Sequence, residues 1–203
     1  MGDFTYESKD TKRSLETYEW DRVWLEHAPD STKPRVLYVG DSISAATWRV
    51  ATTEAKEEIY FDGFATSKAL DNPYFIEALS LFARQEGYRS AVLFNNGLHG
   101  WHLTEEEYAE YYEEMLGKFK ELFGDTPIVL LLTTHIVDAE RNERVKARNE
   151  IVLEIAKKHS LKVVDYYSLT TDESLISSDG VHLTETGYKG LAKAALAAAR
   201  EYI

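Results

Sequence analysis

From about residue 34, the chain alternates between short apolar runs and longer segments in which apolar residues recur at helical spacing. We predict buried strands over residues 36–39, 91–94, 128–132 and 161–164, with a weaker extended segment near 59–61. Helices are predicted between these strands, and the last two cover residues 141–159 and 184–202. This alternation, repeated about five times, predicts a parallel sheet that is covered by helices on both faces.

Start signals support two of these helices. Asn72 and Pro73 combine a capping residue with a proline at the first helical position, which is typical of a helix start. Thr104 and Glu107 have the spacing of a capping box, in which each side chain accepts a hydrogen bond from the other residue's backbone N–H. We therefore expect helices to begin at these two points.

Residues 1–33 do not continue the alternation. The apolar residues between positions 15 and 25, together with Trp20 and Trp24, have a spacing that fits one amphipathic helix. We predict an N-terminal extension over residues 1–33 that packs on a domain formed by residues 34–203.

Composition and charge narrow the class of protein. No apolar stretch approaches the roughly 20 residues needed to span a bilayer, and the first residues lack the pattern of a secretory signal. We expect no membrane association, and either a cytoplasmic protein or a secreted one whose signal is absent from this sequence. The formal charge of −12 would repel phosphate backbones, so nucleic acid is not an expected partner. The chain has no cysteine, which excludes disulfides and thiolate chemistry.

Polar clusters follow three of the predicted strands. They are residues 40–42 (Gly-Asp-Ser), residues 95–96 (Asn-Asn) and residues 133–135 (Thr-Thr-His). Ligands of open parallel sheets bind outside the carboxyl ends of the strands. We therefore expect these clusters to converge on one edge of the sheet.

The residue types at Ser42, Asp179 and His182 point to nucleophilic catalysis. A serine that follows a strand stands at the start of the next helix, where a free N–H and the helix dipole favour developing negative charge. Its hydroxyl needs a base to take its proton, and a histidine suits that task. Asp179 lies three residues before His182, so one turn could supply both the base and the acid that orients it.

The same segments carry a resemblance to a known family. Residues 39–43 (Val-Gly-Asp-Ser-Ile) resemble the first sequence block of the SGNH, or GDSL-like, hydrolases, and residues 179–184 (Asp-Gly-Val-His-Leu-Thr) resemble their last block. The resemblance covers about residues 34–203. It implies an α/β fold of the three-layer, flavodoxin-like type with a central five-stranded parallel sheet, and hydrolysis through an acyl-enzyme formed on Ser42. It separates the chain from the α/β-hydrolases, whose nucleophile lies in a Gly-x-Ser-x-Gly motif.

The middle blocks of this chain depart from the family pattern. In the family, the third block is normally Gly-x-Asn-Asp, and its asparagine donates a hydrogen bond to the oxyanion. The corresponding stretch of this chain begins with Asn95 and Asn96, and the resemblance favours Asn95 as the donor ahead of Asn96. Ser42 contributes its own N–H, and Gly63 and Ser67 are both candidates for the second backbone donor. The residues expected to contact substrate are Asp41, His99, Trp101 and Thr134.

Simpler interpretations exist for several of these residues. Residues 41 and 42 could only cap a helix, and His99 could only pack its loop. We expect no metal site and no cofactor, because no third ligand accompanies His99 and His102. Residues 141, 144 and 148, all arginines, are expected on a helix face that is solvated or paired with acids.

The leading functional hypothesis is an O-acyl esterase that removes acetyl groups from a small-molecule or carbohydrate ester. The same triad would also serve a lysophospholipase, a thioesterase or a sugar O-acyltransferase. A non-catalytic carbohydrate-binding domain is the alternative from another class, and a homo-oligomer is compatible with the predicted sheet.

Overall fold

The runs predicted as strands form the parallel part of one sheet in the computed structural model, which describes residues 15–85 and 87–203. In spatial order these strands are β3 (Tyr60–Thr66), β2 (Arg35–Gly40), β4 (Ala91–Phe94), β5 (Ile128–Leu131) and β6 (Lys162–Val164). The chain thus begins in the interior of the parallel sheet, moves to one side and crosses back to the other. This is the flavodoxin-like strand order, so the predicted fold class is confirmed.

A sixth strand, β1 (Asp21–Trp24), pairs antiparallel with β3 at the edge of the sheet. The amphipathic helix predicted between residues 15 and 25 is therefore wrong, and residues 1–14 of the predicted extension lie outside the described residues. These residues are extended despite their helical spacing, because the edge of β3 offers backbone hydrogen bonds that no local pattern reveals. Residues 21–24 belong to the same sheet as the strands after residue 34, whereas a domain boundary at residue 34 stays a prediction.

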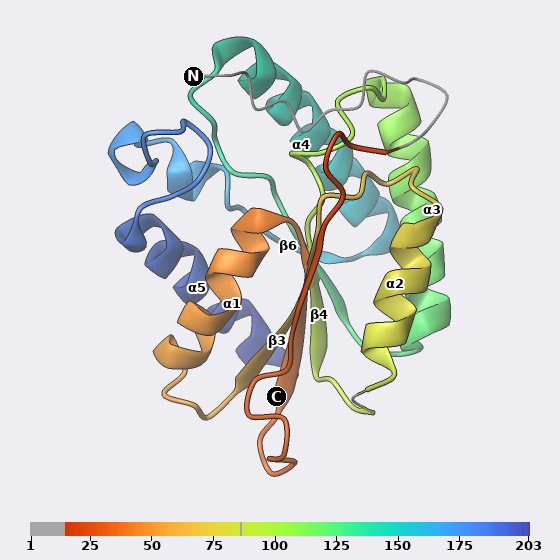
Figure 1. The fold of residues 1–203 in the computed structure, drawn as a ribbon, viewed down its shortest axis with the longest axis vertical. Coiled ribbons are helices and arrows are strands. Elements are labelled where there is room, and N and C mark those ends of the chain that lie inside the picture. The colour runs from red at the N-terminus through yellow and green to blue at the C-terminus, as the bar shows by residue number, and fades with distance from the viewer. Residues whose placement is uncertain (1–14, 86) are drawn as a thin grey trace.

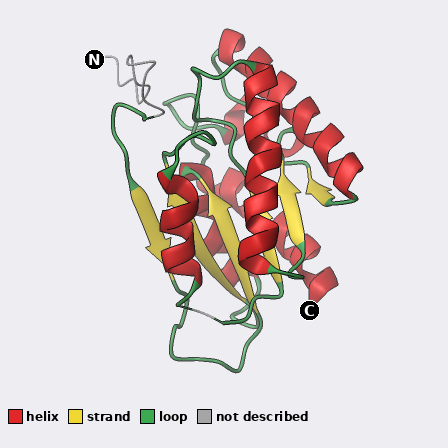
Figure 2. Cartoon of the chain, turned by 90° about the vertical axis from the view of Figure 1, so that its right-hand side faces the viewer, coloured by secondary structure: helices red, strands yellow, loops and turns green. Residues whose placement is uncertain are grey.

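Helices cover both faces of the sheet (Figure 1). On one face lie α1 (Ser42–Glu54) and α5 (Glu185–Ala199), and on the other lie α2 (Tyr74–Ala83), α3 (Glu105–Phe123) and α4 (Ala139–His159). Figure 2 views the molecule from the second face, with the long helices in front of the sheet. No helix of the described residues is both long enough and apolar enough to cross a membrane.

Successive side chains of β2 point to opposite faces of the sheet and so contribute to two separate hydrophobic cores. Val36 and Tyr38 point to the core under α1 and α5, whereas Leu37 and Val39 point to the core under the other three helices. All four side chains are fully buried, as expected for a central strand of a parallel sheet. The sheet is therefore held on both faces, and its carboxyl-terminal edge is a rigid base for loops.

The helix start predicted at Thr104 is confirmed, whereas α2 begins one residue later than predicted, with Pro73 as its N-cap and Tyr74 as its first residue. The capping box of Thr104 and Glu107 opens α3, with both reciprocal hydrogen bonds present. Asn72 Oδ1 accepts a hydrogen bond from the N–H of Tyr74, the first residue of α2.

Candidate active site

Ser42 is the first residue of α1, directly after β2 ends at Gly40. Asp41 caps the helix, because its side chain accepts a hydrogen bond from the N–H of Ile43 at 2.9 Å. Gly40 is required by close packing, since a Cβ there would lie 2.2 Å from Ser44 Oγ. The tight passage from strand to helix presents the half-buried Ser42 at the positive end of the helix dipole.

One turn before α5 supplies both Asp179 and His182. Gly180 lies in the left-handed region with φ of 78°, which lets the chain reverse between them. Asp179 Oδ1 accepts hydrogen bonds from the N–H groups of Val181 and His182, each at 2.9 Å. It also accepts one from the Ser177 hydroxyl at 2.8 Å. The carboxylate is thereby fixed by its own turn.

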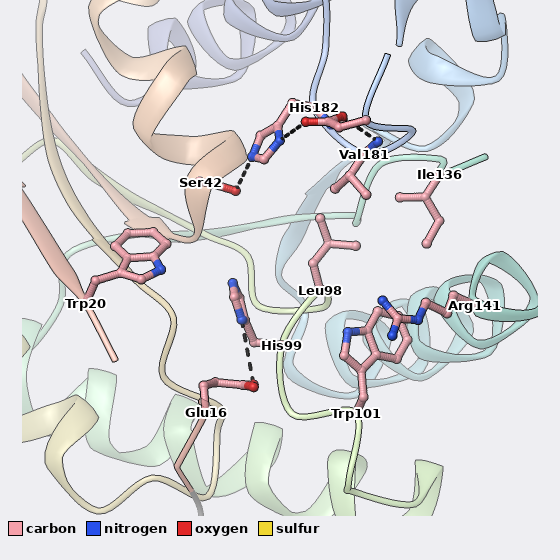
Figure 3. Close-up of a pocket in the computed structure, with 11 residues that line it drawn as sticks. Glu16, Trp20, Ser42, Leu98, His99, Trp101, Ile136, Arg141, Val181 and His182 are labelled. Atoms are coloured by element: carbon pink, nitrogen blue, oxygen red, sulfur yellow. Dashed lines mark hydrogen bonds and ion pairs between the residues drawn. The ribbon is translucent and has the colours of Figure 1, made fainter. Parts of the chain in front are cut away.

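His182 joins the carboxylate to the serine (Figure 3). Its Nδ1 lies 2.6 Å from Asp179 Oδ2, and its Nε2 lies 2.8 Å from Ser42 Oγ. The structure thus brings together all three predicted triad residues from opposite ends of the chain. Because Asp179 holds Nδ1, the neutral ring carries its proton there, and Nε2 is left to accept the proton of the serine hydroxyl.

Hydrogen bonds stabilise the negative charge on Asp179. Partial burial alone would raise the pKa of this carboxyl. The hydrogen bonds from Val181, His182 and Ser177 outweigh that cost and hold the pKa well below its usual range. Asp179 therefore stays ionised and can stabilise a positive charge on the His182 ring.

The triad opens into a cavity of about 610 Å³. His182 and Ser42 lie at one wall, and His99 and Trp101 lie across from them (Figure 3). The full lining comprises Glu16, Trp20, Ser42, Leu98, His99, Trp101, Ile136, Arg141, Asp179, Val181 and His182. A substrate in this cavity would have the serine hydroxyl within reach.

Solved structures share this arrangement of strands and helices. A lipase/acylhydrolase from Enterococcus faecalis matches with a TM-score of 0.67 and 16% identity, over 83% of this chain and 96% of its own. A lipolytic protein of the G-D-S-L family from Veillonella parvula matches with a TM-score of 0.66 and 18% identity, over 80% and 96%. The chain has the SGNH, or GDSL-like, hydrolase fold. A third match is Est24, a carbohydrate acetylesterase from Sinorhizobium meliloti, with a TM-score of 0.66 and 14% identity, over 84% and 100%. No protein-family model and no curated protein matches the sequence.

Within the SGNH fold, the structure does not bring the two candidate asparagines to the cavity. Asn95 donates from Nδ2 to the carbonyl of Leu131 at 2.8 Å and to Thr133 Oγ1 at 3.1 Å, so both of its amide hydrogens are used. Asn96 donates from Nδ2 to the carbonyl of Lys68 at 2.9 Å. Neither side chain lines the cavity, because Asn95 is bound to a carbonyl at the end of β5 and Asn96 to a carbonyl in the loop after β3.

The two candidates for the backbone donor are also placed elsewhere. Gly63 lies in the middle of β3, paired with Trp24 and Tyr38, and a Cβ there would lie 2.1 Å from the Trp48 ring. Its lack of a side chain serves packing under α1 and does not bring it to the oxyanion. Ser67 donates its N–H to the carbonyl of Trp20 at 3.1 Å, so this group holds the segment before β1.

The predicted substrate-contacting residues divide into two groups. His99 and Trp101 line the cavity, as the sequence suggested. Thr134 is buried away from it, and Asp41 is fully buried beneath Ser42. Burial raises the pKa of Asp41, while the nearby His99 and His182 rings and the Ile43 N–H partly offset that effect. Asp41 thus shapes the start of α1 and does not line the cavity.

The arginines of α4 only partly match the expectation that they are solvated or paired with acids. Arg144 does pair with an acid, Glu105, at 2.7 Å. Arg148, however, is fully buried and donates to the carbonyls of Gly97, His99 and Gly100 at 2.7 to 3.0 Å. This face of the helix therefore anchors the loop of residues 97–100 and is not solvated along its whole length.

Several lining residues had no clear signal in the sequence. They are Glu16, Trp20, Leu98, Ile136, Arg141 and Val181. Val181 was recoverable from its place between Asp179 and His182. Glu16 and Trp20 reach the cavity because β1 docks on the sheet edge, which helical spacing did not predict. Within residues 15–85 and 87–203, no three His, Cys, Asp or Glu side chains are grouped closely enough to hold a metal ion.

Proposed function

We propose that this protein is a serine-dependent ester hydrolase, with Ser42 as the nucleophile, His182 as the general base and Asp179 as the residue that orients it. The observation that carries the proposal is the continuous chain from Asp179 Oδ2 through His182 to Ser42 Oγ at the wall of the cavity. The shared fold with lipases and esterases supports the same reaction class.

The first half of the reaction forms an acyl-enzyme. Ser42 Oγ bonds to the ester carbonyl carbon as its proton moves to His182 Nε2, and the carbonyl oxygen becomes an oxyanion. When the tetrahedral intermediate collapses, the bond to the leaving oxygen breaks and His182 Nε2 gives its proton to that oxygen. Asp179 stabilises the charged ring between these two transfers.

The second half releases the acid. A water molecule gives a proton to His182 Nε2 while its oxygen bonds to the acyl carbon. The bond to Ser42 Oγ then breaks, and the serine recovers its proton from His182. The side chains of His182 and Asp179 are 43% and 50% exposed, so water has access to the base.

The substrate that we favour is an acetylated carbohydrate. The cavity combines the indole rings of Trp20 and Trp101 with polar side chains, a mixture that suits a sugar ring with hydroxyl groups. One structure with the same fold is a carbohydrate acetylesterase, which agrees with this choice.

A second candidate is an esterase for longer acyl chains, such as a lysophospholipase or thioesterase. Leu98, Ile136 and Val181 face one another in the part of the cavity next to His182 (Figure 3). This aliphatic cluster could hold several methylene groups, each worth about 0.8 kcal/mol when buried.

The decisive experiment measures hydrolysis of nitrophenyl esters from acetyl to octanoyl by the wild type, Ser42→Ala and Ser31→Ala. Ser31 lies on an exposed loop and serves as the matched control. We expect Ser42→Ala to lose about 10⁴-fold or more in kcat/KM, because the nucleophile is gone, and Ser31→Ala to match the wild type. A preference for acetyl would favour the carbohydrate esterase, and a preference for octanoyl the second candidate. Equal activity in the wild type and Ser42→Ala would contradict the proposal.

A further inference from the structure

A second histidine–carboxylate pair lines the same cavity, across from His182 and Asp179. Nδ1 of His99 lies 3.7 Å from Oε1 of Glu16, and these side chains are only 12% and 2% exposed. The same Glu16 oxygen accepts a hydrogen bond from the N–H of Gly100 at 2.9 Å. A buried carboxylate thus fixes both the ring and the backbone next to it.

The position of the His99 ring is fixed from several sides. Arg148 binds the carbonyl of His99 at 2.8 Å, and the ring makes an edge contact with Trp20 at a centroid distance of 6.4 Å. In Figure 3, one ring nitrogen of His99 faces Glu16 and the other faces the side of the cavity where Ser42 lies. The ring is therefore a pre-positioned polar group aimed at the reaction centre.

Ser42 lies between the two histidines (Figure 3). The base must stand on one side of the attacking oxygen, and the donors to the oxyanion must stand where the carbonyl oxygen will point. His182 takes the first position. For the second, the amides of Asn95 and Asn96 are already bound to backbone carbonyls away from the cavity. His99 lines the cavity and has a ring nitrogen that faces the side where Ser42 lies.

The charges around His99 suit a donor. Two carboxyl groups, Glu16 and the buried Asp41, are its acidic neighbours, and Arg141 from α4 lines the same cavity. Because Nδ1 lies beyond hydrogen-bond distance of Glu16, this contact leaves Nε2 free to carry a hydrogen that it donates into the cavity. A hydrogen bond to a charged acceptor such as an oxyanion is among the stronger kinds.

We propose that His99 donates a hydrogen bond from Nε2 to the oxyanion formed on attack by Ser42, and that Glu16 positions its ring. The inference rests on the proposed ester hydrolysis. Together with the Ser42 N–H at the start of α1, His99 would complete an oxyanion site in which the imidazole takes the part that the family pattern gives to an asparagine. No covalent bond to His99 forms or breaks during the reaction.

The test compares His99→Phe, which keeps a ring but no donor, with His99→Gln, which keeps an N–H donor. We expect His99→Phe to lower kcat by about 10²- to 10³-fold on the preferred nitrophenyl ester, because one oxyanion donor is lost. KM should change little, since the interaction belongs to the transition state. His99→Gln should retain at least about tenfold more activity than His99→Phe. Melting temperatures measured alongside show that each variant is folded.

Labelling of Ser42 by a fluorophosphonate gives a readout that does not depend on the natural ester. The hydroxyl oxygen bonds to phosphorus as fluoride leaves, so the rate reports the serine, its base and the oxyanion site together. We expect His99→Phe to label more slowly than the wild type by a factor similar to its loss in kcat. Glu16 is the positioning residue, and Glu16→Gln keeps the acceptor for the Gly100 N–H. We expect this variant to lose about tenfold in kcat.

The outcomes separate the two proposals. If Ser42-dependent hydrolysis and labelling persist within about fivefold in His99→Phe, the role of His99 is overturned and the hydrolase stands. The same holds if the loss appears only in KM, or if the Phe and Gln variants lose equally. If the wild type shows neither Ser42-dependent hydrolysis nor labelling, the hydrolase proposal fails, and the role of His99 fails with it.

Discussion

Two histidine–carboxylate pairs share one cavity, but they are built in different ways. Asp179 and His182 stand on a single turn, joined at 2.6 Å, with side chains that are 50% and 43% exposed. Glu16 and His99 come from distant segments, lie 3.7 Å apart and are almost buried. The first pair has its geometry fixed locally, whereas the second depends on the packing of the N-terminal segment against the loop after β4.

The difference in contact distance and exposure indicates which pair is suited to proton transfer. A short hydrogen bond to an ionised carboxylate fixes one tautomer and supports a ring that gains and loses a proton in every cycle. A longer contact inside a buried wall fixes position without directing a proton transfer. The first pair is therefore suited to acid–base catalysis, and the second to holding a ring in a fixed position.

Between the two pairs, the largest expected effect comes from Asp179→Asn. The three donors that bind Oδ1 would keep the amide oxygen there and turn its NH₂ group toward His182 Nδ1. That arrangement places the ring proton on Nε2, which then cannot accept the proton of Ser42. We expect kcat to fall by about 10³- to 10⁴-fold.

Steady-state kinetics on the best nitrophenyl ester, with circular dichroism to verify folding, measures this loss. Glu16→Gln is the matched change in the other pair and is expected to lose far less. Similar losses in the two variants would show that the pairs do not differ in the way described.

A smaller effect is expected from Arg148→Met, which disturbs the second pair through its loop. The change leaves two buried carbonyls and one partly buried carbonyl in residues 97–100 without their donor. We expect a loss of about 3 kcal/mol or more in the free energy of unfolding, because each buried acceptor without a partner costs about 1–3 kcal/mol. Urea titration measures it, with Lys146→Met on the exposed side of α4 as the control. A loss no greater than that of the control would contradict the anchoring role.

The smallest expected effect is the pH dependence of stability in Asp41→Asn. Burial raises the pKa of Asp41 in the folded state, with partial compensation from His99, the Ile43 N–H and His182. A raised carboxyl pKa favours folding below the unfolded pKa of about 3.9, and this contribution is lost as the pH rises through the folded value. Asparagine caps a helix equally well and does not titrate there.

We therefore expect the melting temperature of Asp41→Asn, relative to the wild type, to increase as the pH is raised from 4 to 7. Thermal unfolding at several pH values tests this expectation. A difference that stays constant, or one that decreases with pH, would show that the buried carboxyl does not impose this cost.

The parts of the molecule that could be predicted from the sequence are those with local causes. The strands of the parallel sheet follow from continuous apolar runs, and the proximity of Asp179 to His182 follows from a three-residue turn. Ser42 could be placed at a helix start because a strand, a glycine and a capping aspartate precede it. Each of these signals lies within a few residues of the feature that it predicts.

The errors have non-local causes. The Asn95 amide donates a hydrogen bond to the carbonyl of Leu131 on the adjacent strand β5, and nothing near Asn95 in the sequence indicates that partner. Arg148 is buried because three carbonyls of another loop surround it. Asp21–Trp24 are extended because β3 offers a free edge. Such pairings are decided by neighbours in space, so residue spacing along the chain did not indicate them.

The edge strand β1 has a consequence for solubility. It covers the outer edge of β3, and the ion pair of Lys68 with Asp21 at 2.8 Å fastens it there. Without it, β3 would expose a row of unpaired N–H and C=O groups, which is a template for joining another chain. The sheet ends instead in β1, which is only four residues long and includes Asp21 and Arg22, and a short, charged edge strand is a poorer template. Substitutions that loosen the segment carrying Glu16 and Trp20 would therefore reduce the yield of soluble protein.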